Sequence, residues 1–226
     1  MRNTFAKTIT NLAKKREDIV LLSGDIGNRM FDEFKEVAPN RFFNCGIAEA
    51  NMMSMAAGMG ISNLRPFVYT ITPFTTSRCF EQIKIGVAYH QSKVTIVGTG
   101  SGLSYAELGP THHSLDDLGI LSTIPSLNIY TPCDSNELEY CINQSILNNG
   151  PNYIRIGKKG EKNLSNFDPL SSSIDVNWIS RGGNIAVVGY GPILSEAESI
   201  VKDLKKINKE ISILSVIKFS PFDTKL

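Results

Sequence analysis

The sequence predicts an α/β protein: a mostly parallel sheet with helices on both faces, followed by the start of a second α/β unit. Two observations carry this prediction. Apolar runs of strand length alternate with segments of helical length along the 226 residues, and the connections between them are short. Parallel strands joined in this way need cover on both faces of their sheet. We therefore expect functional residues where strands end and loops begin.

The first elements carry clear signals. Apolar residues at helical spacing predict a helix over residues 4–15, and the run IVLLSGDIG then predicts a buried strand that ends in a turn flanked by glycines. A helix that ends at Pro39 precedes a strand over residues 41–44. The segment GIAEANMMSMAAGMGI predicts a helix whose small residues let neighbouring backbones approach closely, and we expect it to be packed on both sides.

The same alternation continues through the rest of the first unit. Its further elements are, in order, a strand (PFVYTI), a helix (SRCFEQIKIGVAYH), a strand ending in glycines (KVTIVGTGS), a loop leading into a helix (LGPTHHSLDDLGILSTI), a strand (LNIYTPCD), a helix (NELEYCINQSILNN) and a strand (PNYIRIGKK). The turns SGDIG, VGTGSG and VGYGP lack the full glycine pattern of a dinucleotide site, so we interpret them as structural turns.

The domain organisation follows from a change in composition. We place the first domain at residues 1–160 and a polar, serine-rich linker at residues 161–182. Residues 183–226 then give one strand–helix–strand unit, which we interpret as part of a second domain. A lone unit of this kind cannot cover both faces of its strands. Either that domain is truncated or another chain completes it.

Composition argues against several classes of protein. The formal net charge is +1, which gives no basis for binding nucleic acid or an anionic membrane surface. The four cysteines are widely spaced and form no CxxC pair, so neither a disulfide framework nor a zinc site is expected. The N-terminal segment lacks the apolar core of a signal peptide, and no uncharged run has the character of a membrane span. We expect a cytoplasmic protein.

Glu49 is the one charged side chain between Phe42 and Leu64. It falls in the first turn of a predicted helix, where the helix dipole favours glutamate, so one interpretation is a residue that faces solvent. Its neighbours at helical spacing are apolar, which favours burial instead. A carboxylate buried without a counter-charge resists ionisation, and such a carboxyl is suited to sharing a proton with a weakly basic ring nitrogen.

Two of the three histidines, His112 and His113, lie in the loop LGPTHHSLDD. Adjacent side chains do not readily face one site, so we expect at most one of them to be functional. The HxxxD spacing to Asp116 or Asp117 resembles that of metal ligands, but it spans a loop and a helix start, so we favour first-turn positions for both aspartates. A histidine in a polar loop can donate a proton or bond substrate hydroxyls.

Five motifs in order resemble the pyrimidine-binding domain of the transketolase group of thiamine diphosphate enzymes: GIAEANMMSMAAGMG, PFVYTITPFTTSRCFEQI, GPTHHSLDD, YTPCDSNE and GPNYIRIGK. The resemblance covers residues 4–160, and the chain from residue 183 resembles the start of the family's C-terminal domain. It implies the α/β fold that holds the pyrimidine half of thiamine diphosphate.

The resemblance also implies roles for individual residues. Glu49 would hydrogen-bond the N1′ nitrogen of the cofactor's aminopyrimidine ring and would be catalytic. Asp25 would lie near the cofactor and a subunit interface. His112 matches a catalytic histidine that contacts substrate oxygens. Lys158 falls near the position of an arginine that binds the substrate phosphate, a role that lysine can take as a point charge.

Two positions depart from the family pattern. The aromatic residue that stacks on the pyrimidine aligns with Ile71, and Phe74 follows shortly after it. Either Ile71 gives a plain apolar contact with the cofactor or Phe74 takes the aromatic role. The family's aspartate before GPTH, which contacts a substrate hydroxyl, is replaced by Leu108. This replacement implies an altered donor or acceptor.

The other half of the cofactor site is missing from the sequence. The family binds the diphosphate and Mg²⁺ through Gly-Asp-Gly followed by Asn-Asn, whereas this chain has Gly24, Asp25 and Ile26 without such a sequel. We therefore expect no metal ligand here and a separate partner, an N-terminal transketolase-like subunit that carries the diphosphate-binding domain. The two would form a heterotetramer with the active site between chains.

The expected activity is that of a transferase that works as a complex and moves a two-carbon ketol unit between sugars, sugar phosphates or other sugar derivatives. Two alternatives stay open. The chain could belong to a different enzyme on the same scaffold, as the beta subunit of a 2-oxo acid dehydrogenase or a deoxyxylulose-phosphate-synthase-like enzyme. It could also be a non-catalytic assembly or regulatory subunit, which Ile71 and Leu108 favour and which Glu49 and His112 oppose.

Overall fold

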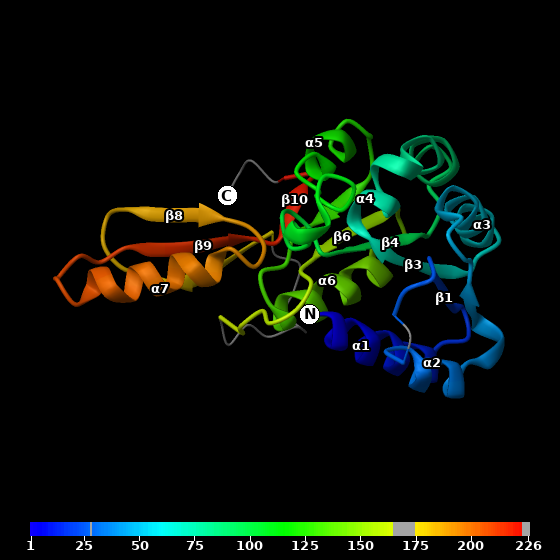
Figure 1. Ribbon diagram of the computed structural model, residues 1–226, viewed down its shortest axis with the longest axis horizontal. Helices are drawn as coiled ribbons and strands as arrows, with labels where there is room; N and C mark the ends of the chain where they lie inside the picture. The colour runs from blue at the N-terminus through cyan, green and yellow to red at the C-terminus, as the bar shows by residue number, and fades with distance from the viewer. Residues whose placement is uncertain (28, 165–174, 223–226) are drawn as a thin grey trace.

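The structure is a computed structural model that describes residues 1–27, 29–164 and 175–222. Its larger part is built on a seven-stranded sheet, whose strands are β1 (Ile19–Ser23), β2 (Phe42–Asn44), β3 (Arg65–Ile71), β4 (Thr95–Thr99), β5 (Asn128–Tyr130), β6 (Asn152–Ile156) and β10 (Lys218–Ser220). They lie in the order β10-β5-β6-β4-β3-β1-β2 (Figure 1). All pairings among β1 to β6 are parallel, and β10 runs antiparallel to β5. The expected mostly parallel sheet is confirmed.

Helices cover both faces of this sheet, as expected (Figure 1). Successive residues of β1 point to opposite faces, so Ile19 and Leu21 enter one core while Val20 and Leu22 enter the other. The first core is closed by α1 (Arg2–Lys15), α2 (Asp32–Val37) and α6 (Ser135–Leu147). The second core is closed by α3 (Glu49–Ile61), α5 (Asp117–Leu121) and a π-helical segment, η3 (Gln82–Tyr89). Burial on both faces explains why the strands are apolar throughout.

Two elements show more detail than was expected. The segment SRCFEQIKIGVAYH is helical, but it is not one α-helix: a 3-10 turn, η2 (Ser77–Cys79), precedes η3. Within this chain, helix α3 is packed on one side. Met52 and Met53 are buried, whereas Asn51 and Ser54 are exposed, because α3 lies in the outer layer of this chain. A further 3-10 turn, η1 (Pro39–Arg41), leads into β2.

The C-terminal part forms an extension with its own sheet, β7-β9-β8 (Val176–Ser180, Ser212–Val216 and Ala186–Gly189), and helix α7 (Leu194–Lys205). Strands β8 and β9 are parallel and joined by α7, which is the expected strand–helix–strand unit. Strand β7 falls in the expected linker, part of which lies outside the described residues. After β9 the chain returns to the large sheet as β10, and the domain boundaries stay a prediction.

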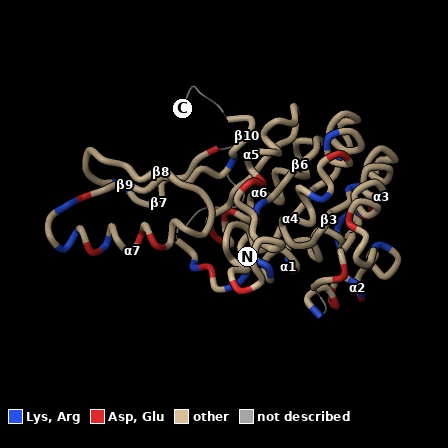
Figure 2. Tube along the Cα trace, turned by 45° about the horizontal axis from the view of Figure 1, so that its top comes forward, with Lys and Arg blue, Asp and Glu red and all other residues tan. Residues whose placement is uncertain are grey.

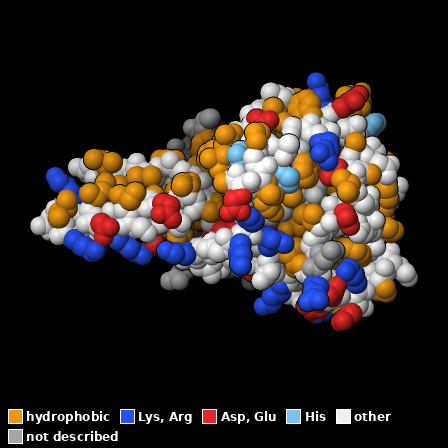
Figure 3. All heavy atoms as spheres, viewed as in Figure 1, with side chains coloured by type: hydrophobic (Ala, Val, Ile, Leu, Met, Phe, Trp, Pro, Cys, Tyr) orange, Lys and Arg blue, Asp and Glu red, His pale blue; other side chains and the backbone are white. Residues whose placement is uncertain are grey.

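The extension has two different surfaces. Lysines and acidic residues alternate along α7 (Figure 2), where Glu198 pairs with Lys202 and Asp203 pairs with Lys206. The opposite side of the extension is apolar (Figure 3). Two apolar residues of the extension outside α7, Ile185 and Val188, are more than half exposed. The charged helix is thus a solvated face, while part of the strand surface lacks a cover in the described structure. No described helix is both long and apolar enough to cross a membrane.

Glu137 on α6 joins the extension to the large unit. Its carboxylate is fully buried and accepts hydrogen bonds from the backbone N–H of Cys133 (2.8 Å), the hydroxyl of Ser215 (2.9 Å) and the amide of Asn177 (3.0 Å). Ser215 and Asn177 lie on β9 and β7. Burial raises the pKa of Glu137, and the hydrogen bonds to its carboxylate oppose that rise. One buried acid therefore fixes two strands of the extension against α6.

Candidate active site

The residues singled out in the sequence gather along one edge of the large sheet. Strands β1, β2, β3, β4 and β6 are parallel neighbours, so their carboxyl ends meet there. At or after these ends come Asp25 (β1), Glu49 (β2), Ile71 and Phe74 (β3), His112 (β4) and Lys158 (β6). Topology thus brings together side chains that are far apart in the sequence.

Glu49 begins α3 and is 3% exposed, so the interpretation of a residue that faces solvent was wrong. Its burial has a partner that the sequence reasoning missed. A guanidinium nitrogen of Arg78, Nη1, lies 2.8 Å from Oε2 of Glu49. Arg78 lies 29 positions further along the chain, in η2, and its side chain is 44% exposed. The carboxylate is therefore not isolated, because a cation covers one of its oxygens.

Phe74 lies beside this ion pair, on the short helix α4 (Thr72–Thr75) that follows β3. The guanidinium carbon of Arg78 is 4.2 Å from the centroid of the Phe74 ring. The hydroxyl of Thr72 donates to the carbonyl of Thr99 (3.0 Å), which holds α4 against the end of β4. Ile71 is buried at the end of β3, whereas Phe74 and Arg78 line a cavity of about 630 Å³.

His112 links this cavity to a second group of aromatic and basic side chains. Its ring meets the Phe74 ring edge-on, with centroids 5.2 Å apart, and lies 5.8 Å from the ring of Tyr105. Its Nδ1 lies 2.9 Å from the hydroxyl of Thr111. His113 lines the cavity with Phe74, and its Nε2 lies 3.3 Å from a carbonyl of the 3-10 turn η4 (Ala106–Leu108). The two histidines therefore have different surroundings.

Lys158 also contacts Tyr105, with its Nζ 4.3 Å from the ring centroid. The ring is seated on Gly100, whose φ is +71° and where an added Cβ would come 1.9 Å from a Tyr105 carbon. Lys158 and Arg2 line one cavity of about 370 Å³, and Nε of Arg2 donates to the hydroxyl of Tyr69 (3.2 Å). Arg2 was not singled out in the sequence, since no local motif marks it and only the packing of α1 brings it here.

Asp25 makes a different contact. It follows β1 in a left-handed conformation (φ +54°), and its carboxylate accepts a hydrogen bond from the Asn44 side chain (3.0 Å). The side-chain oxygen of Asn44, Oδ1, in turn accepts from the backbone N–H of Gly46 (3.0 Å). These two hydrogen bonds shape the turn that places Glu49 at the start of α3.

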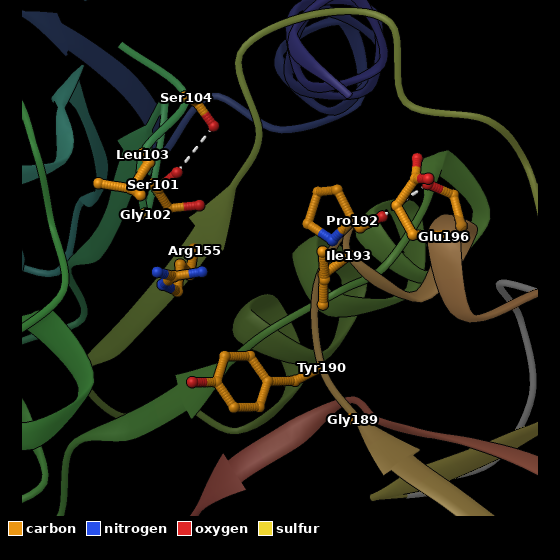
Figure 4. Close-up of a pocket in the computed structure, with 11 residues that line it drawn as sticks. Ser101, Gly102, Leu103, Ser104, Arg155, Gly189, Tyr190, Pro192, Ile193 and Glu196 are labelled. Carbon is orange, nitrogen blue, oxygen red and sulfur yellow. Dashed lines mark hydrogen bonds between the residues drawn. The ribbon is translucent and has the colours of Figure 1, made fainter. Parts of the chain in front are cut away.

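A third cavity, of about 590 Å³, lies between the large unit and the extension (Figure 4). Arg155 and Tyr190 line it from the two units, and the guanidinium of Arg155 is bonded to Asp117 (2.8 Å). Asp117 also accepts from the hydroxyl of Tyr153 (2.7 Å). Asp116 and Asp117 stand at the start of α5, as expected. Among the residues the structure describes, no cluster of His, Cys, Asp and Glu could hold a metal ion.

Fold and site together define a class: an α/β domain with a buried carboxylate, an aromatic ring and a histidine loop at the carboxyl edge of a parallel sheet. The chain belongs to the transketolase family, because residues 1–160 match the family described as "Transketolase, pyrimidine binding domain". It is a subunit of a thiamine diphosphate-dependent, transketolase-like transferase that acts in a complex.

Similar proteins include subunits of this kind. One subunit of the apulose-4-phosphate transketolase of Phocaeicola vulgatus is 29% identical over 224 residues, which cover 98% of this chain and 72% of that protein. The 6-deoxy-6-sulfo-D-fructose transketolase subunit SqwH of Clostridium sp. is 28% identical over 224 residues, 99% of this chain and 70% of that one. A solved structure described as "Split gene transketolase, inactive beta4 tetramer" superposes with a TM-score of 0.86 at 26% identity, covering 99% of this chain and 73% of that chain.

Proposed function

We propose that this chain is the pyrimidine-binding subunit of a split transketolase that moves a two-carbon ketol unit between anionic sugars. The observation that carries the proposal is the buried carboxylate of Glu49 at the carboxyl edge of the sheet, bonded to Arg78, whose guanidinium lies over the Phe74 ring. The partner is an N-terminal transketolase-like subunit that brings the diphosphate site and the Mg²⁺ ligands, in a heterotetramer.

The residues present fit the aminopyrimidine ring of thiamine diphosphate. Glu49 offers a carboxylate in a dry setting that strengthens a hydrogen bond, and Phe74 offers an aromatic face on a cavity of about 630 Å³, a volume usual for small-molecule sites. When bound, the cofactor supplies a nucleophilic carbon and an electron sink. The part of Glu49 is to hold a proton at the N1′ atom of the ring. Asp25 braces the turn that positions Glu49.

The residues that would bind the substrate follow Phe74 in the series of side-chain contacts described above. His112 stands between Phe74 and Tyr105, where its imidazole can bond substrate oxygens. Lys158 and Arg2 line the next cavity and suit a phosphate or sulfonate. The names of two similar proteins contain a sugar phosphate and a sulfosugar, which supports an anionic substrate. Leu108 is 53% exposed where the family pattern has an aspartate, and its apolar side chain cannot hydrogen-bond a substrate hydroxyl.

The proposal is tested on the complex that this chain forms in its native cells. Affinity capture of the chain is expected to bring a partner subunit in equal amount. With thiamine diphosphate and Mg²⁺, the complex should lengthen an aldose phosphate by two carbons at the expense of a ketose phosphate, while the chain alone should not. Release of carbon dioxide from a 2-oxo acid without ketol transfer would contradict the proposal and favour a dehydrogenase or synthase instead.

Replacing Arg2 with alanine is expected to raise KM for a phosphorylated acceptor ~10- to 100-fold with little change in kcat, since a hydrogen bond to a charged group contributes ~1.5–3 kcal/mol. KM for a neutral acceptor of the same skeleton should stay within about twofold. Steady-state kinetics of the complex measure both. Lys7→Ala, on the exposed side of the same helix, is the matched control. Equal effects on both acceptors would show that Arg2 does not bind the phosphate.

A further inference from the structure

We propose that Arg78 holds the place of the pyrimidine ring in the cofactor-free subunit, so that its guanidinium and the cofactor compete for Glu49. This inference rests on the proposed function of Glu49 and extends it. It assigns a role to a residue that the sequence patterns did not mark. Arg78 would act through Glu49 as a positioning residue, without taking part in bond making.

The contacts of Arg78 are those that an aminopyrimidine ring would make. The guanidinium is planar, its carbon lies 4.2 Å from the centroid of the Phe74 ring, and one of its nitrogens donates to Glu49 at 2.8 Å. A pyrimidine ring bound to Glu49 and stacked on Phe74 needs the same ring face and the same carboxylate. Two planar groups cannot occupy one face of Phe74 while both bond Oε2 of Glu49. Arginine suits such a substitute because its weakly hydrated plane stacks on aromatic rings.

Burial explains why the cofactor-free chain needs this contact. Glu49 is 3% exposed, and an ionised carboxylate buried without a partner is strongly unfavourable. Before the cofactor arrives, Arg78 supplies the opposite charge. Once a ring nitrogen of the cofactor hydrogen-bonds the carboxylate, Glu49 no longer depends on Arg78 for a partner.

The surroundings of Arg78 allow it to leave. Its side chain is 44% exposed and is carried by the short 3-10 turn η2, so moving it away exposes a group already in contact with solvent. Asp116 lines the same cavity and offers a second carboxylate for the released guanidinium. A protein that must first give up an internal contact binds its ligand more weakly than one that is free of it. Arg78 therefore lowers the apparent affinity of the site for the cofactor.

The test compares cofactor affinity in the complex of this chain with its partner, stripped of cofactor by dialysis. Thiamine diphosphate is titrated calorimetrically in the presence of Mg²⁺. We expect Arg78→Met to bind the cofactor ~10-fold more tightly than wild type, because the competitor is gone. Arg78→Lys keeps the charge without the plane and should fall between the two. Weaker or unchanged binding in Arg78→Met would overturn the proposal, because Arg78 would then support the bound cofactor or be indifferent to it.

A double-variant cycle keeps the result independent of folding and of the proposed function. In a Glu49→Gln background, adding Arg78→Met should change the cofactor affinity less than twofold, because the ion pair between Arg78 and Glu49 is already absent. The melting temperature of the isolated chain gives a second readout: Arg78→Met should lower it, and the double variant should recover part of the loss. Recovery without any cofactor binding to the wild-type complex would refute the proposed function while confirming the pairing of Arg78 with Glu49. A full loss of affinity on adding Arg78→Met to Glu49→Gln would contradict the competition.

Discussion

Glutamine in place of Glu49 is expected to slow ketol transfer by the assembled complex ~10²- to 10⁴-fold, the contribution of a well-placed proton-transfer group. Glutamine keeps the shape of the side chain, but it carries no charge to pair with Arg78 and cannot hold and release a proton at the ring nitrogen. The loss should therefore fall on kcat at saturating cofactor. Single-turnover rates with a ketose phosphate donor measure it directly.

The control for this variant is Glu81→Gln, which changes an exposed glutamate just before η3. It should leave kcat unchanged within error. The melting temperatures of both variants should stay near that of the wild type, because neither substitution removes packing. Full activity of the Glu49→Gln complex would show that this carboxylate is structural, and the non-catalytic interpretation would then gain.

Removal of the Glu137 carboxylate is expected to destabilise the junction of the two units strongly. Glu137→Ala removes a fully buried acceptor that serves the backbone N–H of Cys133, the buried hydroxyl of Ser215 and the partly buried amide of Asn177. A loss of ~3 kcal/mol in the free energy of unfolding follows, because each unsatisfied buried group costs ~1–3 kcal/mol and partial relaxation recovers some of it. Urea unfolding followed by circular dichroism measures this loss.

The pH dependence of that stability has a definite sign. Burial raises the pKa of Glu137 above the ordinary value of 4.5, so the folded state binds the proton more tightly than the unfolded state. The extra stability is fully present below pH 4.5 and is lost as the pH rises through the folded-state pKa. Glu137→Gln cannot ionise, so its free energy of unfolding should lack this dependence on pH. The difference in stability between the wild type and Glu137→Gln should therefore shrink as the pH rises. Glu139→Gln, on the same helix and partly exposed, should keep the wild-type slope.

Much of the fold could be predicted because its signals are local. Apolar runs such as IVLLS and VTIVGT are buried on both faces of the sheet, and their continuous apolar sequence indicates this burial directly. Strand β10 could not be predicted in its place, since three residues carry little pattern and its partner β5 lies far back in the chain. The π-helical form of η3 was likewise hidden, because its spacing of apolar residues is also that of an α-helix.

The candidate site, too, could be predicted only in part. Glu49 stood out because it is a lone charge in an apolar segment, and His112 and Lys158 were found through motifs. Arg78 and Arg2 were missed because neither neighbours its partner in the sequence: the first reaches Glu49 through the turn after α4, and the second reaches the Lys158 cavity through the packing of α1. A charge pair between distant segments becomes visible when the sheet order is known.

Strand β10 has a consequence for synthesis on the ribosome. It pairs with β5, and the backbone N–H of Thr131 donates to the carbonyl of Ile217 just beyond that pairing (2.7 Å), so it covers what would otherwise be an open strand edge. Open edges recruit strands from other molecules. The nascent chain exposes the β5 edge from the moment β5 emerges until residues 218–220 follow, with the whole extension made in between. In that interval the polypeptide is prone to aggregation, and β5 stays uncovered until β10 has been made.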